Sequence, residues 1–321
     1  MFLSKLINPI VHAIRFKKIV KMAEDGDVTL QNKLGVMYHN GTYVKQDYAQ
    51  ALYWYTKAAH QGYAPAQTNL GEMFEYGYGV APDDTEAAHW YQKAAHKGDT
   101  IAQNAFGWMV ESGRGVEQNE AEAFHWYHRS AEQGNADAQY NLAQMYHAGR
   151  GVEQDYKEAL HWYRKASEQD YPPAQTALGL MYVRAQGVIQ NDVQGIDWFH
   201  KAALHGYADA QVRLAEMYEG RKEPQKAFKW YVKAAQQGNS EGQTNLGLMF
   251  VFGNGVIKNN VIAYALLDMA VENGSETAKE IRDTIAKELS LTQKEEVKFM
   301  RKEPDKMWKL IENYLDKKIE K

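Results

Sequence analysis

The chain has 321 residues, of which 45% are hydrophobic and 24% charged, and these values of folded proteins exclude wholesale disorder. Its net charge of -4 argues against a general nucleic-acid binder, which needs a dominant basic surface to displace counterions. The absence of cysteine excludes disulfides, thiolate zinc sites and cysteine nucleophiles, and no apolar run reaches the roughly 18 residues of a membrane span.

The N-terminal segment, residues 1–23, is predicted to form an amphipathic helix. Apolar residues recur between Leu3 and Ile14, interrupted by Pro9, and a basic cluster follows at 15–18. We expect this helix to cap the structure that follows, and contact with a membrane surface or a partner is the alternative. The segment lacks the clean apolar region and cleavage site of a secretory signal, so we expect a cytoplasmic protein. A processed N-terminus would instead indicate a periplasmic or exported one.

Residues 24–274 consist of seven copies of one pattern. Tryptophan recurs every 36 residues from Trp54 to Trp198, and Trp230 follows after 32. An earlier block in each copy repeats a glutamine and a methionine. These residues are Gln31, Gln67, Gln103, Gln139, Gln175, Gln211 and Gln243, with Met37, Met73, Met109, Met145, Met181, Met217 and Met249. Agreement over seven copies predicts a repeat array.

Each copy is predicted to form two helices joined by a turn. In the second copy Ala66, Leu70 and Met73 are spaced i, i+4 and i+7, which places them on one helical face. The block around Trp90 has the same kind of spacing. Glycines and a proline at 77–83 separate the two helices.

Two structural positions recur in each copy, the first usually glycine and the second glycine or alanine. One ends the second helix in a left-handed conformation, as Gly62 and Gly98 do, and Asp170 replaces it once. The other lies inside the first helix, as Gly71 does, where it costs about 1 kcal/mol relative to alanine. We expect close approach of the next helix to compensate for that cost.

A single helical hairpin cannot bury its own apolar face, so neighbouring hairpins are expected to stack around a continuous core. The tryptophan and methionine positions supply that core. The predicted fold class is therefore all-α, an α/α superhelical solenoid of about seven helix-turn-helix repeats.

These blocks resemble the Sel1-like repeat family, relatives of the tetratricopeptide repeats. The resemblance rests on an Ala-Gln-x-x-Leu-Gly-x-Met-Tyr block, a Gly-x-Gly-Val turn and an Ala-x-x-Trp-Tyr-x-Lys-Ala-Ala block. It covers about residues 24–290 and implies a bacterial protein-interaction protein. The sixth copy lacks four turn residues at 219–224, so we expect local irregularity there. Leu266 and Leu267 replace Trp-Tyr in the seventh, which suits a unit near the end of a stack.

Residues 275–321 are predicted to form a helical C-terminal cap. The run from Thr292 to Glu295 fits a capping box that opens one helix. An amphipathic stripe from Met307 to Ile319 predicts a last helix, for which a docking peptide is the alternative to a cap.

No catalytic, metal or cofactor site is expected. His125 and His128 have the i, i+3 spacing that can share a metal, but Glu132 is only a weak further ligand. His89 and His161 share the register of His125, yet packed helices lie about 8–10 Å apart, too far for one zinc ion. No phosphate loop or nucleophile elbow is present. We therefore expect a protein that is not an enzyme.

The resemblance to tetratricopeptide repeats implies that the first helix of each copy lines a concave inner face. The registers concerned are those of 65, 68, 72, 75 and 76, and helical geometry places 68, 72 and 75 nearly opposite the core stripe. Read through all copies, they predict an acidic, partly apolar face with Arg184 as its one cation. Candidate partner-binding residues are Glu72, Glu75, Tyr76, Trp108, Glu111, Tyr140, Gln144, Leu180, Glu216 and Glu219.

Trp108 is the strongest single candidate, because it is a tryptophan outside the core register. Packing against a neighbouring helix is the alternative for its side chain. We expect a scaffold or adaptor that binds a protein or peptide with basic and apolar features, and no nucleic acid. The alternative, implied by resemblance to bacterial relatives that protect against secreted phospholipase effectors, is an immunity protein that sequesters a toxin.

Overall fold

A computed structural model describes residues 16–316 of the chain. These residues form helices and turns and contain no strand, so the predicted all-α repeat class is confirmed. The chain divides into two compact units, Met1–Lys165 and Ala166–Lys321, and each is described by itself.

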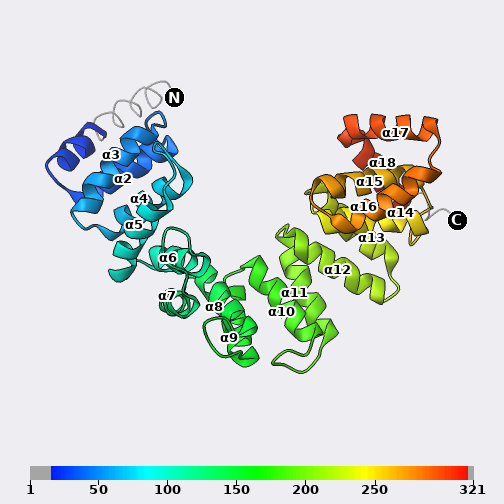
Figure 1. Cartoon of the computed structure of the whole chain (residues 1–321), viewed down its shortest axis with the longest axis horizontal. Helices are drawn as coiled ribbons and strands as arrows, with labels where there is room; N and C mark the ends of the chain where they lie inside the picture. The colour runs from blue at the N-terminus through cyan, green and yellow to red at the C-terminus, as the bar shows by residue number, and fades with distance from the viewer. Residues whose placement is uncertain (1–15, 317–321) are drawn as a thin grey trace, which may run out of the picture. The chain divides into compact units, whose positions relative to one another are not determined.

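The helices of each unit follow one another as hairpins (Figure 1). We call the first helix of each hairpin helix A and the second helix B. The first unit contains a helix over residues 16–24 and the pairs α2 (Val28–Asn40) and α3 (Tyr48–His60), α4 (Ala64–Tyr76) and α5 (Asp84–His96), α6 (Thr100–Ser112) and α7 (Glu120–Glu132), and α8 (Ala136–Ala148) and α9 (Tyr156–Ser167), whose last residues belong to the second unit.

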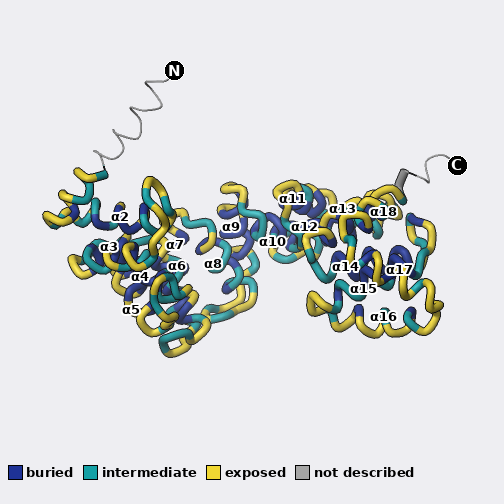
Figure 2. The backbone as a smooth tube through the Cα atoms, turned by 90° about the horizontal axis from the view of Figure 1, so that it is seen from above, coloured by how far each residue is buried: buried dark blue, intermediate teal, exposed yellow. Residues whose placement is uncertain are grey.

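The second unit continues with three further pairs and three C-terminal helices. The pairs are α10 (Pro172–Val183) and α11 (Asp192–Leu204), α12 (Ala208–Gly220) and α13 (Pro224–Gln236), and α14 (Ser240–Phe252) and α15 (Asn260–Glu272), and they are followed by α16 (Glu276–Glu288), α17 (Leu291–Lys302) and α18 (Pro304–Asp316). In both units the buried residues lie between packed helices and the exposed ones concentrate on outer surfaces and turns (Figure 2).

The tryptophans at the repeated position in the first unit are part of the core, as predicted. Trp54, Trp90, Trp126 and Trp162 are only 5–6% exposed, whereas Trp198 and Trp230 in the second unit are half-buried. A basic side chain one helical turn later covers each of these indole rings. In α5, for example, Lys93 Nζ lies 4.6 Å from the Trp90 ring centroid.

The glycine inside helix A makes room for an aromatic ring of helix B. A Cβ atom at Gly71 would lie 2.7 Å from the Tyr91 ring, and one at Gly179 would lie 2.5 Å from the Phe199 ring. Since no real Cβ approaches so closely, the expected close approach of the next helix is confirmed. In the seventh repeat the corresponding neighbour is the fully buried Leu267.

The residue that closes each repeat adopts the predicted left-handed conformation. The φ angle is +82° at Gly62 and +91° at Gly98, and Asp170 adopts the same region with φ +56°. A glycine tolerates this region without strain, which explains why it fills the position in six of the seven copies.

The repeated glutamine of helix A connects the ends of two B helices. In α6, Gln103 Nε2 donates to the carbonyl of Ala95 in the preceding hairpin at 3.2 Å. Its Oε1 accepts from Gln133 Nε2, at the end of helix B in its own hairpin, at 2.7 Å. The same acceptor bond recurs between other pairs: Gln61 and Gln31, Gln237 and Gln211, and Asn273 and Gln243.

This glutamine ladder is interrupted at two rungs. The residue that should donate is Lys97 in the second repeat and His205 in the fifth. Gln67 Oε1 and Gln175 Oε1 are consequently buried without a hydrogen-bond partner in the described part of the chain. Lys97 instead donates to the carbonyl of Gly62.

Residues 1–15 of the predicted N-terminal helix lie outside the described residues. Over residues 16–24 the chain is helical, and Phe16, Ile19 and Val20 pack against a core cluster that includes Leu34.

The helix α17 begins two residues earlier than predicted. The capping box is formed by Ser290 and Gln293, whose side chains bond each other's backbone N–H groups at 3.2 Å and 2.9 Å. The prediction of a box at Thr292 is therefore wrong. The physical reason is that Ser290 is the extended residue at the junction, so its hydroxyl is the one that meets the free N–H groups of α17.

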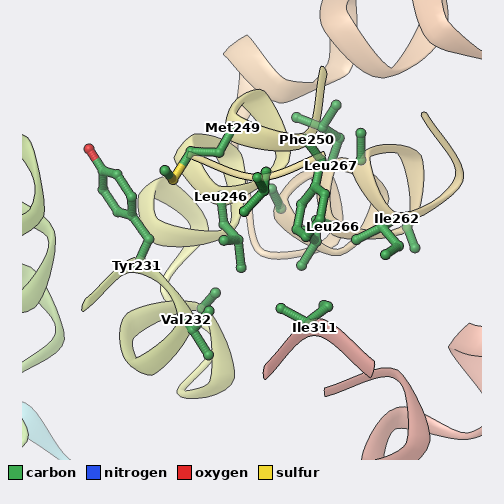
Figure 3. Packing of buried hydrophobic residues seen from close by; sticks show 14 of the residues in the cluster. Tyr231, Val232, Leu246, Met249, Phe250, Ile262, Leu266, Leu267 and Ile311 are labelled. Atoms are coloured by element: carbon green, nitrogen blue, oxygen red, sulfur yellow. The ribbon is translucent and has the colours of Figure 1, made fainter. Parts of the chain in front are cut away.

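The helix α18 folds back onto the last repeats. Met307 and Ile311 are buried in the same apolar cluster as residues of α13, α14 and α15, and Figure 3 shows Ile311 turned toward that cluster. Asn259 Nδ2 also donates to Tyr314 Oη at 2.7 Å. The predicted stripe residue Ile319 lies outside the described residues.

Candidate functional site

The candidate partner-binding residues form a surface on the A helices that we call the A-helix wall. It is described separately for the two units. In the first unit it carries Glu72, Glu75, Tyr76, Trp108, Glu111, Tyr140 and Gln144, and in the second Leu180, Glu216 and Glu219.

One of the predicted registers does not belong to the open wall. Thr68 is buried and its hydroxyl donates to the Ala64 carbonyl at 3.2 Å, and Thr176 and Thr244 are buried with equivalent bonds. Val212, at the same register, is fully buried. The expectation that this register faces a partner is wrong for these residues. Consecutive A helices meet along this side, as the 2.8 Å bond from Asn69 in α4 to Asn32 in α2 shows.

Three acids of the wall are hydrogen-bonded to helix B of their own hairpin. Tyr91 Oη donates to Glu75 at 2.7 Å and Tyr127 Oη donates to Glu111 at 2.7 Å. The third bond, from Tyr231 Oη to Glu219, measures 2.8 Å. A buried phenol needs an acceptor, so these carboxylates stabilise the hairpins.

The same acids also receive a donor from the next repeat. Arg114 lies 3.8 Å from Glu75 and donates to Asp84 at 3.0 Å, Arg150 pairs with Glu111, and Asn254 donates to Glu219 at 2.9 Å. The sequence reading missed these roles. For Glu75 and Glu111, the signal that could have revealed them is an acid 16 residues before the Tyr of a Trp-Tyr pair, with an arginine 39 residues after the acid in the turn of the next repeat.

Glu72 differs from these acids. It is half-buried, and within the described residues it takes part in no hydrogen bond or ion pair. Burial raises the pKa of its carboxyl, and the neighbouring Glu75 and Asp99 raise it further. Its charge is therefore uncompensated, and a cation supplied from outside would stabilise it.

In the second unit, burial also raises the pKa of Glu216, but Arg213 opposes that shift. The Arg213 guanidinium contacts Glu216 at 2.7 Å and Glu241 at 2.5 Å. This part of the wall is less acidic than the sequence alone predicts, because Arg213 neutralises its carboxylates. Arg213 directly follows Val212, so it lies one residue away from a predicted register and was not counted among the wall residues.

Two aromatic residues are exposed on the wall of the first unit. Trp108 is 38% exposed, with the Arg114 guanidinium 4.7 Å from its ring centroid, and Tyr76 is 59% exposed. Arg114 thus joins the Trp108 indole to Glu75, the neighbour of Tyr76. Aromatic rings, a bound guanidinium and the uncompensated Glu72 lie in one region of α4 and α6.

The remaining candidates are held by local contacts. Gln144 Nε2 donates to Tyr140 Oη at 2.5 Å, and the Tyr140 ring lies 5.7 Å from that of Tyr163. Leu180 is half-buried. Phe252, at the end of α14, is 76% exposed and adds an apolar group to the wall of the second unit.

Within residues 16–316 there is no group of three or more histidines and acids arranged to hold a metal ion. His125 is exposed, and the Nδ1 atom of His128 lies 3.6 Å from Glu132. No helix in this part of the chain combines the length and the apolar character needed to cross a bilayer.

Comparison with known proteins identifies the repeat. The Sel1 repeat model matches the chain seven times in direct succession, at residues 30–63, 64–99, 100–135, 136–171, 172–207, 208–239 and 240–275. These matches cover the seven helical hairpins, except for the first two residues of α2.

Solved structures of proteins with the same repeat resemble the chain. A Sel1 repeat protein from Oxalobacter formigenes is 37% identical, with a TM-score of 0.67, over 83% of this chain and 78% of that one. The protein c5321, a protective antigen of uropathogenic Escherichia coli strains with an SLR fold, is 28% identical with a TM-score of 0.58. That match covers 93% of this chain and 79% of the other. With seven consecutive repeat matches and this likeness, the chain belongs to the Sel1 repeat family.

Proposed function

We propose that this protein is a non-catalytic scaffold whose A-helix wall in the first unit binds a protein or peptide partner with basic and apolar features. Sel1 repeats are typical scaffolds for protein–protein interaction. The partner's chemistry follows from the wall itself.

The region around Glu72, Tyr76 and Trp108 is the observation that carries this proposal. Glu72 is a half-buried carboxylate that pairs with no cation among residues 16–316, and the two aromatic side chains beside it are exposed to solvent. A lysine or arginine of a partner would compensate the carboxylate, and apolar groups next to it would cover the rings.

A trade-off between stability and binding supports a functional role for Glu72. Its raised pKa means that the ionised carboxylate is less favourable in the folded protein than in the unfolded chain. Replacement by glutamine removes this cost, so Glu72→Gln should stabilise the protein at neutral pH. The same replacement should weaken partner binding.

The experiment compares partners captured by the tagged full-length protein and by a Glu72→Gln/Trp108→Ala variant. Glu75 is left unchanged, because its bond to Tyr91 holds the hairpin together. We expect the variant to bind the partner with a Kd that is higher by about tenfold or more. This is the loss typical of removing an aromatic hot spot. A matched control, Glu86→Gln/Leu204→Ala, changes exposed residues of B helices and should leave binding unchanged.

An unchanged set of captured proteins with the Glu72→Gln/Trp108→Ala variant would exclude the A-helix wall as the binding surface. A single toxin bound one-to-one, encoded beside the gene and lethal to cells that lack this chain, would support the immunity alternative over a scaffold.

A further inference from the structure

The sixth repeat carries a basic surface that the rest of this acidic chain does not predict. Residues 221–233 contain five cations and one acid, Glu223, although the whole chain has a net charge of -4. The five cations are Arg221, Lys222, Lys226, Lys229 and Lys233. They lie in the shortened turn and on α13.

Two of these cations are specific to the sixth repeat. The third residue of helix B is an acid in α5, α7 and α9, as Glu122 is in α7, but it is Lys226 in α13. The sixth residue of those helices is histidine, as His125 is in α7, but it is Lys229 in α13. Lys233, in contrast, occupies a position that is basic in the first six repeats, where it covers the tryptophan ring.

A groove of about 380 Å³ lies beside these lysines. Apolar parts of Tyr218, Phe228, Trp230 and Val232 line it together with the three lysines of α13, and Glu312 of α18 forms part of its edge. Glu312 accepts a hydrogen bond from Gln236 at 2.9 Å, and Glu223 pairs with Lys226. Within the described residues Lys229 forms no ion pair.

We propose that this groove binds an acidic peptide segment that inserts an apolar side chain between the lysines. Its charge is complementary to carboxylates, and its interior is complementary to an aliphatic or aromatic side chain. The inference concerns α12, α13 and α18 and does not depend on the partner of the A-helix wall.

The aromatic rings of the groove favour a peptide over a nucleic acid. Lys233 Nζ lies 4.3 Å from the Trp230 ring centroid, and Lys226 Nζ lies 5.2 Å from that of Tyr218. Lysine side chains thus already cover ring faces on which bases would have to stack. Carboxylates of a peptide, in contrast, bind the lysine ammonium groups and do not require a free ring face.

The test uses the full-length protein and a fluorescein-labelled model peptide of alternating glutamate and leucine, with binding followed by fluorescence anisotropy. The variant Lys226→Glu/Lys229→His installs the residue pair that α7 carries, so the fold is expected to tolerate it. We expect it to weaken peptide binding by about tenfold or more, and added salt to weaken binding to the unmodified protein. Lys279→Glu on the exposed surface of α16 is the matched control and should leave binding within about twofold.

A second variant, Lys226→Gln/Lys229→Gln, should show a smaller loss in the same direction, and thermal unfolding verifies that each variant is folded. Equal binding by both variants and the unmodified protein would overturn the proposal, as would equal binding of a glutamine-for-glutamate peptide. If the protein bound a labelled single-stranded oligonucleotide through these lysines and did not bind the peptide, the proposal would be overturned in favour of a nucleic-acid ligand. A dimer that dissociates on Lys226→Glu/Lys229→His, with no peptide bound, would replace the peptide by a second copy of the chain.

Discussion

The third repeat, α6 and α7, and the sixth, α12 and α13, share their internal contacts although their turns differ in length. The tyrosine of helix B donates to an acid of helix A in both, at 2.7 Å to Glu111 and at 2.8 Å to Glu219. The glutamine ladder is also complete in both, from Gln133 to Gln103 and from Gln237 to Gln211.

The difference lies in the turn and the outer surface. The third repeat reaches Asn119 through a turn that starts at Gly113 with φ +69°, whereas the sixth turns through Lys222 with φ +60°. Both turns end with the same backbone bond, from Asn119 N–H to the Val110 carbonyl at 3.0 Å and from Glu223 N–H to the Tyr218 carbonyl at 2.9 Å. Four turn residues can therefore be lost while the backbone bond that closes the hairpin is kept. The difference between the two repeats appears on their outer surface.

The largest expected effect is a loss of stability that differs between the alanine variants of Trp126 and Trp230. Trp126→Ala should lower the free energy of unfolding by about 3–5 kcal/mol, because the side chain is buried against Phe106. Trp230→Ala should cost roughly half as much, because that side chain is only half-buried. Urea unfolding, with hydrogen exchange to locate the loss in the array, measures both. Equal losses would contradict the difference in burial between the two side chains.

The tyrosine bonds should behave alike in the two repeats. Tyr127→Phe and Tyr231→Phe should each cost about 1–2 kcal/mol at neutral pH, and unequal costs would contradict a shared role. Burial raises the pKa of both phenols, and the adjacent Glu111 or Glu219 raises it further.

These raised pKa values also predict a pH dependence. In the unfolded chain tyrosine loses its proton near pH 10, at which the folded protein still retains it. The free energy of unfolding should therefore decrease as the pH rises above about 10. Each Tyr→Phe variant should show a shallower decrease in thermal unfolding measured across this range. If a Tyr→Phe variant lost stability with pH as steeply as the unmodified protein, the raised tyrosine pKa would not be the cause of the decrease.

The smallest expected effect in this comparison is a gain in stability. Both compared repeats have a complete ladder rung, whereas Gln67 Oε1 in the second repeat is buried without a partner because Lys97 replaces the donor. Lys97→Gln should stabilise the protein by about 0.5–1.5 kcal/mol, because the buried bond that it supplies outweighs the exposed bond from Lys97 to the Gly62 carbonyl that it removes. Lys97→Ala, which supplies none, is the control. Equal melting temperatures for the two variants would show that the ladder bond contributes nothing.

Much of the fold follows from residue spacing. The period of Trp54 to Trp198, the glycine against the Tyr91 ring and the left-handed closing residue are all local consequences of residue type. The N-cap of α17 was misplaced at Thr292 because serine and threonine both cap helices, and only the end of α16 decides between Ser290 and Thr292.

The candidate site was less accessible to sequence reasoning. Helical geometry shows which residues lie opposite the core stripe, but it does not show where the next A helix makes contact, so the burial of Thr68 was missed. Charge alone likewise did not distinguish Glu75, which accepts from Tyr91, from Glu72, which has no partner. That difference depends on contacts between hairpins, which spacing within one hairpin does not contain.

The ladder glutamine reaches a carbonyl eight residues earlier, across the junction between hairpins, as Gln103 reaches Ala95. If residues 100–135 were excised, Gln139 would stand at the same distance in sequence from Ala95 and could make the same bond. Recombination between copies can therefore add or remove one hairpin and reproduce an existing junction. The gene can in this way lengthen or shorten the molecule in whole steps without having to evolve a new interface.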